Sequence, residues 1–174
     1  MKGWYLIVII VPNVIYMVEV QLKLPMYLKK ILVARYGEMY ILKDTSLLGM
    51  AISNVLHKKY YAVRRYRDRN NPPKNYRFKE LSEIYPVKLS VNRATRKGFE
   101  INDAKIHKIV RAIDNSIREE LYRDAINNKE EFGIDFQTTF LNFLDQYGIE
   151  EEELSYESIR KHFNRVKNNF EYVN

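Results

Sequence analysis

Basic and aromatic side chains are interleaved over residues 57–79, which read HKKYYAVRRYRDRNNPPKNYRFK. Nine of these residues are Lys or Arg, one is acidic and five are aromatic. Cations neutralise nucleic-acid phosphates, and aromatic rings stack on unpaired bases. The segment therefore predicts a nucleic-acid contact, with a well-solvated connector between folded parts as the alternative. The candidate phosphate contacts in it are Lys58, Lys59, Arg64, Arg65, Arg67 and Arg69.

The positive charge of the chain is concentrated in this segment. The whole chain has a formal net charge of +7. Residues 1–56 hold six basic and three acidic groups (+3), residues 57–79 nine and one (+8), and residues 80–174 fourteen and eighteen (−4). A field focused in this way attracts phosphate backbones or anionic lipid more selectively than an evenly basic surface does.

A second group of candidate contacts lies on the predicted last helix, YESIRKHFNRVKNNF. Its apolar residues recur at helical spacing, so its polar residues face outward. Arg and Asn are the residue types that make bidentate contacts with guanine and adenine, and Lys suits phosphates. Four glutamates at 150–153 precede this helix and would repel phosphates, so its C-terminal half is the expected contact. The outward residues are Arg160, Lys161, Asn164, Arg165, Lys167 and Asn168, and all of them except Asn168 are candidate contacts.

Signals for catalysis or metal binding are poor. The three histidines, His57, His107 and His162, are isolated from one another, and none belongs to a recognised metal motif. The chain has no cysteine, which excludes disulfides and thiolate metal sites. It also has no glycine-rich phosphate loop and no nucleophile elbow. We therefore expect a non-enzymatic protein without catalytic residues, metal or cofactor.

Hydrophobic periodicity predicts an α+β, mainly helical fold with short strands plus a C-terminal three-helix element. VEVQLKLP alternates apolar and polar residues and predicts a half-buried strand, and Gly37 caps the helix after it. The candidate N-caps of later helices are Asp44, Thr45 or Ser46, then Asn102 or Asp103, then Asp135 and Ser155. The predicted strands cover 18–24, 39–43 and 85–93, and the predicted helices cover 26–37, 47–59, 103–127, 136–147 and 156–170.

The apolar run at residues 3–18 has three interpretations. It could form core strands, or anchor the chain to a membrane, or be an extension upstream of a natural start at Met17. It is shorter than the roughly 18–20 residues of a spanning helix, and Pro12-Asn13 interrupts it. We therefore expect a cytoplasmic protein, without excluding membrane contact.

Four parts of the chain are predicted from these features. Residues 1–17 form the apolar segment and residues 18–65 a strand-helix-helix unit. Residues 66–84 form a basic linker in which consecutive prolines rule out helix, and residues 85–174 a strand followed by a three-helix unit.

Two parts resemble DNA-binding folds. VEVQLKLP, a helix and a Ser/Thr-capped helix are similar to the ribbon-helix-helix family, which implies that Glu19, Gln21 and Lys23 face DNA. The seven residues 38–44 between the helices are a longer turn than that family has. The two last predicted helices resemble a helix-turn-helix, again with a longer turn.

The span from VKLSVNRATRKGFEINDAKI through FLDQYGIEEEELSYESIRKHFNR resembles small basic, mostly uncharacterised proteins of phages and mobile elements of gut bacteria, and residues 143–165 are its recognisable piece. This resemblance implies a phage or mobile-element setting, without a defined activity. The resulting hypothesis is a DNA-binding regulator or accessory factor. RNA as the bound nucleic acid and a homo-oligomer stay open, and the alternative function is a phage structural or protein-interaction module.

Overall fold

A computed structural model describes residues 17–56, 81–98 and 103–171. The α+β, mainly helical class predicted from the sequence is confirmed. The elements in chain order are β1 (Met17–Leu24), α1 (Met26–Tyr36), β2 (Tyr40–Ile41), α2 (Leu47–Leu56), β3 (Glu83–Ser90), α4 (Val91–Lys97), α5 (Asp103–Phe132), α6 (Phe136–Gln146) and α7 (Tyr156–Glu171). Within these ranges, no helix is both long and apolar enough to cross a membrane.

The three strands form one sheet in the order β1-β3-β2. Strand β3 pairs antiparallel with β1 over its whole length, from Met17 opposite Ser90 to Leu24 opposite Glu83. It also pairs in parallel with β2, where Tyr40 lies opposite Val87. The centre of the sheet is therefore a strand that follows the basic segment in sequence, although both of its neighbours precede that segment.

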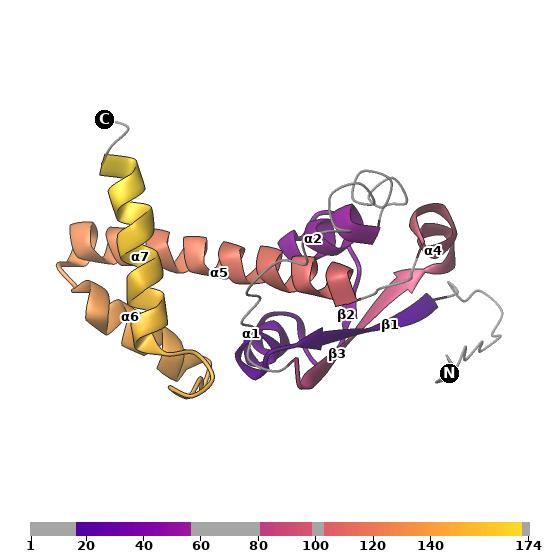
Figure 1. Cartoon of the computed structure of the whole chain (residues 1–174), viewed down its shortest axis with the longest axis horizontal. Coiled ribbons are helices and arrows are strands. Elements are labelled where there is room, and N and C mark those ends of the chain that lie inside the picture. Colours follow the sequence, from indigo (N-terminus) through magenta and orange to yellow (C-terminus); the bar gives the residue numbers. More distant parts are fainter. Residues whose placement is uncertain (1–16, 57–80, 99–102, 172–174) are drawn as a thin grey trace, which may run out of the picture.

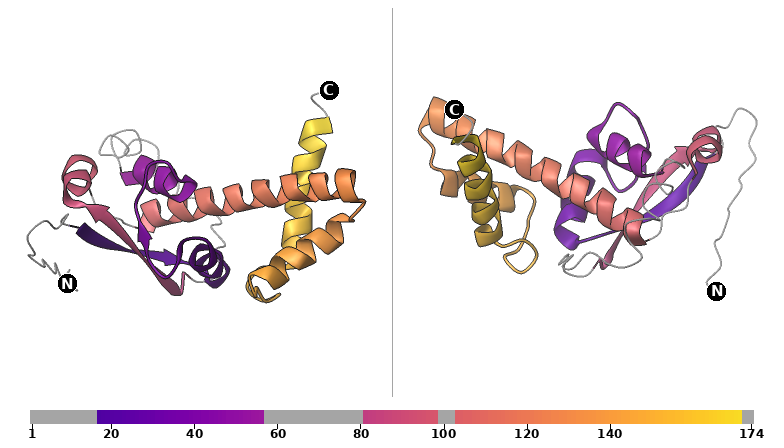
Figure 2. Two further views of the ribbon diagram at one scale, coloured as in Figure 1. Left: turned by 180° about the vertical axis from the view of Figure 1, so that it is seen from behind. Right: turned by 45° about the horizontal axis from the view of Figure 1, so that its top comes forward.

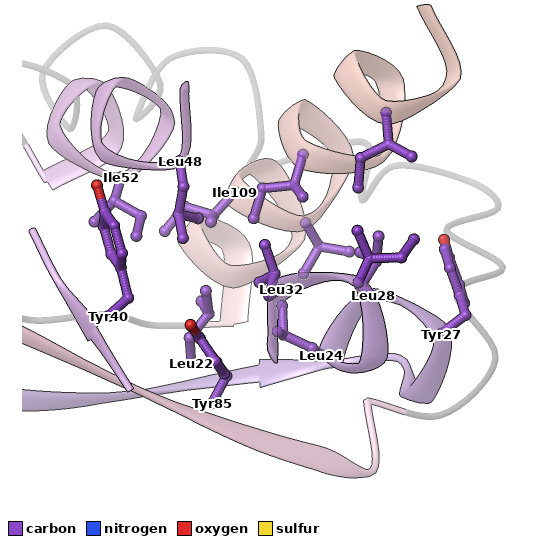
Figure 3. Packing of buried hydrophobic residues seen from close by; sticks show 14 of the residues in the cluster. Leu22, Leu24, Tyr27, Leu28, Leu32, Tyr40, Leu48, Ile52, Tyr85 and Ile109 are labelled. Carbon is purple, nitrogen blue, oxygen red and sulfur yellow. The ribbon is translucent and has the colours of Figure 1, made fainter. Parts of the chain in front are cut away.

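One face of the sheet forms the floor of the core. Alternate residues of β1 and β3 are buried, among them Leu22, Leu24 and Tyr85, which have no exposed surface. Helices α1, α2 and the first part of α5 lie over them and contribute Leu28, Ile52 and further apolar side chains (Figure 3). Burial raises the pKa of Tyr85 to about 12, and its hydroxyl donates a hydrogen bond to the carbonyl of Gly37.

Helix α5 joins this part of the molecule to the C-terminal helices. Figure 1 shows α5 running from the sheet, α1 and α2 at one end to α6 and α7 at the other, where α7 crosses it, and Figure 2 shows the same arrangement from two other sides. Its apolar stripe, from Ile106 through Ile113 to Leu121, is buried along its length. The helix extends five residues beyond its predicted end, to Phe132, because Gly133 supplies the positive φ that ends it only there.

The third predicted strand is wrong at its C-terminal end. Residues 85–93 were expected to be one strand with Val91 on its buried face, but β3 ends at Ser90 and Val91 begins α4. The Ser90 hydroxyl accepts a hydrogen bond from the Arg93 backbone N–H at 3.4 Å, which is an N-cap. The Val91 side chain is consequently 39% exposed.

The two predicted folded units meet in several places. Strand β3, assigned to residues 85–174, begins at Glu83 and lies between the strands of the first unit. Lys30 on α1 reaches the loop before α7, where its Nζ lies 2.8 Å from a Glu153 carboxylate oxygen and 2.6 Å from the Gly148 carbonyl. Most of the predicted linker, 66–80, and the apolar segment 1–16 lie outside the described residues.

Gly49 offers a test of the packing around α2. A Cβ atom at this position would overlap the backbone carbonyl of Lys43. Gly49→Ala should therefore lower the free energy of unfolding by about 1–3 kcal/mol, although alanine is normally better than glycine inside a helix by about 1 kcal/mol. Urea unfolding followed by circular dichroism measures the change.

Asn54→Ala is the matched control for Gly49→Ala, since Asn54 is an exposed position of the same helix. We expect it to change the stability by less than about 0.5 kcal/mol. Equal stability of Gly49→Ala and the wild type would contradict the described path of the chain from Lys43 to Gly49.

Candidate nucleic-acid interface

The predicted contact residues fall into two groups. The six in the basic segment, at positions 58–69, lie outside the described residues. The other five lie on α7, where Arg160, Lys161, Asn164 and Arg165 are exposed and Lys167 is half-buried. The structure therefore defines the surroundings of the five residues on α7.

Helix α7 starts at a well-capped N-terminus. The Ser155 hydroxyl accepts a hydrogen bond from the Ser158 backbone N–H at 3.2 Å, as expected from the sequence. A Glu151 carboxylate oxygen accepts another from the Tyr156 N–H at 3.1 Å. The glutamates before the helix thus act in part as capping groups, which suits the positive end of the helix dipole.

Another of these glutamates is tied to the N-terminal half of the chain. Glu153 pairs with Lys30 and also accepts a hydrogen bond from the Glu150 backbone N–H at 3.2 Å. From the sequence alone, we expected the four glutamates at 150–153 to repel phosphates. Because the charge of Glu153 is paired and Glu151 caps the helix, their repulsion of a ligand is smaller than the count of four suggests.

Aromatic rings hold α7 against α5 and α6. Phe163 is 4% exposed, and its ring centroid lies 4.7 Å from Phe136, 5.2 Å from Phe140 and 5.1 Å from Tyr122. Ile159, one turn earlier, is equally buried. This side of α7 is fixed in the core, so the opposite side is fixed toward solvent.

A polar groove of about 580 Å³ lies where α7 passes α5. It is lined by three basic side chains, Arg118, Lys161 and Arg165, two acidic ones, Asp114 and Glu157, and one histidine, His162. Its volume is within the range of roughly 300–1,000 Å³ of small-ligand sites, although its lining is more polar than most of them. The groove is completed by Asn115, Ser155 and Ser158.

Arg118 is positioned by contacts to two other residues, Asp114 and Ser158. Its Nε lies 3.0 and 3.1 Å from the two Asp114 carboxylate oxygens, and its Nη1 donates to the Ser158 carbonyl at 3.4 Å. Asp114 also accepts a hydrogen bond from the Tyr27 hydroxyl on α1 at 3.0 Å. Burial, followed by the nearby Asp114 charge, raises the pKa of Tyr27, so the phenol stays a donor. The network links α1, α5 and α7 below the groove.

Glu157 partly neutralises the exposed face of α7. Its carboxylate accepts two hydrogen bonds from Arg160, at 2.8 and 2.9 Å, and lies 3.6 Å from the Lys161 Nζ. Hydrogen bonding to Arg160 lowers the pKa of Glu157, which is therefore charged at neutral pH. Exposed pairs of this kind are weak, so a phosphate can compete with Glu157 for these cations.

Sequence reasoning missed Arg118 and His162 as members of this site. Arg118 lies on α5, 40 positions before Ser158, and no local pattern indicates that the two meet. The H-x-x-R spacing of HFNR at 162–165 was attributed to chance, and no binding role was predicted for His162. Its position three residues before Arg165 was the available signal, because residues three apart on a helix are neighbours.

The strand residues named by the ribbon-helix-helix resemblance are also exposed. Glu19, Gln21 and Lys23 lie on the outer face of the sheet, opposite the core. Strand β1 pairs with β3 of the same chain, and its other edge has no strand among the described residues. Within the described ranges, no three His, Asp or Glu side chains form a group that could hold a metal ion.

Comparisons with protein-family models, curated proteins and solved structures find no match to the chain. Function is therefore proposed from the residues and the geometry above.

Proposed function

We propose that the chain is a non-enzymatic nucleic-acid-binding protein whose main ligand is DNA. The observation that carries this proposal is the pairing of a +8 segment at 57–79 with a second cationic surface on α7. Phosphate contacts come from Arg64, Arg65, Arg67 and Arg69, with additional contacts from α7. Positive groups of this number bind phosphates by releasing counterions, which needs no catalytic apparatus.

The α7 surface supports phosphate contact rather than base reading as its main role. Its N-terminal turn carries Glu157 and follows the acidic loop, so the most favourable potential lies further along the helix. Lys161, Arg165 and Lys167 occupy that part. Asn164 lies among them and is the residue suited to a base contact.

The biological role we propose is that of a regulator or accessory factor of a phage or other mobile genome. The resemblance to small basic phage and mobile-element proteins supports this setting. An accessory factor that binds through charge acts on many sequences, so strong sequence preference is not required.

Fluorescence anisotropy with a labelled duplex of about 20 base pairs tests the proposal. Even non-specific binders reach roughly 10⁻⁴–10⁻⁶ M at physiological salt, so we expect a Kd below about 100 µM at about 50 mM salt. No binding in that range would overturn the proposal. Single-stranded DNA and RNA of the same sequence are measured in parallel. A preference for single strands that is lost in Tyr66→Ala or Tyr76→Ala would assign stacking on bases in place of groove binding.

One observation favours the alternative of a protein-interaction module. Ile41 and Ile84 are 46% and 47% exposed on the outer face of the sheet, and the outer edge of β1 is open among the described residues. Open edges and exposed apolar residues are typical of pairing surfaces. This alternative predicts self-association or a protein partner, together with no salt-dependent binding of nucleic acid.

A further inference from the structure

His162 is held in one protonation state by its neighbour on α7. The Arg165 Nη2 lies 2.8 Å from the His162 Nδ1. A guanidinium can only donate hydrogen bonds, so Nδ1 accepts this one and the ring is neutral, with its proton on Nε2. Protonation of Nδ1 would break the bond and place two cations against each other. Without a ligand, this arrangement therefore disfavours the imidazolium.

Some of the other groups around His162 lower its pKa and others raise it. Helix α5 presents Arg118, Asp114 and Glu119, α7 adds Arg165, and α6 contributes the Phe140 ring to the adjoining small cavity. Among the described residues, Tyr122 of α5 and the pair Lys161 and Glu157 on α7 also line the groove or the adjoining cavity. Burial, then Arg118 and Arg165, lower the pKa of His162, and Asp114 and Glu119 oppose them only in part. The groove thus lacks enough negative charge to keep the ring protonated.

We propose that the groove between α5 and α7 binds one phosphate group, held by Arg118, Lys161 and Arg165, and that His162 takes up one proton as the phosphate enters. This inference rests on the proposed function, since the phosphate is taken to be one of the nucleic-acid backbone. The inference specifies where one phosphate binds and predicts that one proton is taken up on binding.

Four side chains, those of Arg118, Lys161, Arg165 and protonated His162, can donate hydrogen bonds to the phosphate. A phosphate oxygen is a stronger acceptor for Arg165 than a neutral imidazole nitrogen, because its hydrogen bonds are charge-assisted. When Arg165 turns to the phosphate, Nδ1 loses its donor and accepts a proton from solvent. The imidazolium then donates to the same phosphate. Arg118 contributes as well, because its contacts to Asp114 and Ser158 occupy two of its five N–H groups.

The proton uptake predicts the sign of a pH effect. A bound anion raises the pKa of His162, so the bound state holds more protons than the free state between the two pKa values. Affinity for the phosphate therefore increases as the pH falls through that window, about tenfold for each unit by which the pKa rises. A phosphodiester does not titrate between about pH 5 and 8, where histidine is the side chain that does. The change must consequently come from the protein.

The test is DNA affinity measured by anisotropy from about pH 7.5 to about pH 5.5. The probe is a duplex with 5′-hydroxyl ends, which carries no titrating phosphomonoester. We expect the wild type to bind about three- to tenfold more tightly at the lower pH. His162→Gln, which can still accept the Arg165 hydrogen bond, should remove most of that gain.

His107→Gln is the matched control, because His107 lies on α5 outside the groove lining. It should retain the pH dependence of the wild type. An NMR titration of His162 gives a second measurement that does not depend on variants. Its pKa should rise by about one unit on saturation with the duplex.

The outcomes separate this inference from the proposed function. DNA binding with the same pH dependence in the wild type and His162→Gln, or an unchanged His162 pKa, would overturn the phosphate subsite and leave DNA binding intact. No binding to DNA at either pH would overturn the proposed function. A further NMR titration measures the His162 pKa in the presence of inorganic phosphate at constant ionic strength. A rise of the His162 pKa with it alone would support the subsite and show that the ester is not needed.

Discussion

Phe163→Ala is expected to lower the free energy of unfolding by about 3–5 kcal/mol, because the ring is lost from the centre of the C-terminal helices. Three aromatic rings of α5 and α6 lie around it, with centroids 4.7–5.2 Å away, so its removal leaves a cavity among them. Urea unfolding measures the loss. Nucleic-acid affinity should fall as well, since α7 then no longer holds its cations in one place.

Phe132→Ala is the control for this variant. Phe132 is the same residue type, but its side chain is 69% exposed at the end of α5. We expect its replacement to change stability by less than about 0.5 kcal/mol. Similar losses from both variants would show that the aromatic cluster around Phe163 is not the part that holds α7.

Neutralisation of the C-terminal half of α7 is expected to weaken binding strongly. The variant carries Lys161→Ala, Arg165→Ala and Lys167→Ala, and it leaves Arg160 with its partner Glu157. Each lost phosphate contact makes the slope of log K against log salt less negative by about 0.9. The slope should therefore change by about 2–3, and affinity at about 50 mM salt should fall at least tenfold. Anisotropy titrations at several salt concentrations measure both quantities.

A control with the same change of net charge separates the α7 surface from overall charge. Lys43→Ala, Lys88→Ala and Arg96→Ala together remove three cations near the sheet and α4, far from α7 along α5 (Figure 1). This variant should keep most of the affinity of the wild type. An equal loss in the two triple variants would contradict a localised contact on α7.

The individual helices and strands could be predicted because the spacing of apolar residues indicates which side of each element is buried. Leu28, Ile31 and Leu32 recur at helical spacing and are buried, and Gly37, Asp135 and Ser155 end or begin helices as expected. The alternation of Val20, Leu22 and Leu24 likewise corresponds to the buried face of β1. These patterns depend only on residues a few positions apart.

The arrangement of the elements could not be predicted in the same way. The position of β3 between β1 and β2 depends on pairing across more than 40 residues, for which the sequence holds no local sign. Strand β3 was also extended too far, because Val91 continues its alternation although Ser90 already caps a helix. The hydrogen bond from the Arg93 N–H to the Ser90 hydroxyl starts a helix at a point where the alternation of apolar residues alone predicts more strand.

The candidate site could be predicted only in part for the same reason. The outward cations of α7 follow from the periodicity of one helix. The groove requires that α7 cross α5, which brings Arg118 to Ser158, and the acidic loop is held by Lys30, which is 123 positions before Glu153. The sequence therefore indicated which cations are exposed, whereas the contact of Arg118 with Ser158 and that of Lys30 with Glu153 join segments far apart in the chain.

The salt dependence of duplex binding by the full chain tests the central claim most directly. Anisotropy measured between about 50 and 200 mM salt gives the slope of log K against log salt, which counts the neutralised phosphates. The proposed contacts in 57–69 and on α7 predict a slope of about −4 or steeper. A slope near zero, or no binding at about 50 mM salt, would contradict nucleic-acid binding through these cations.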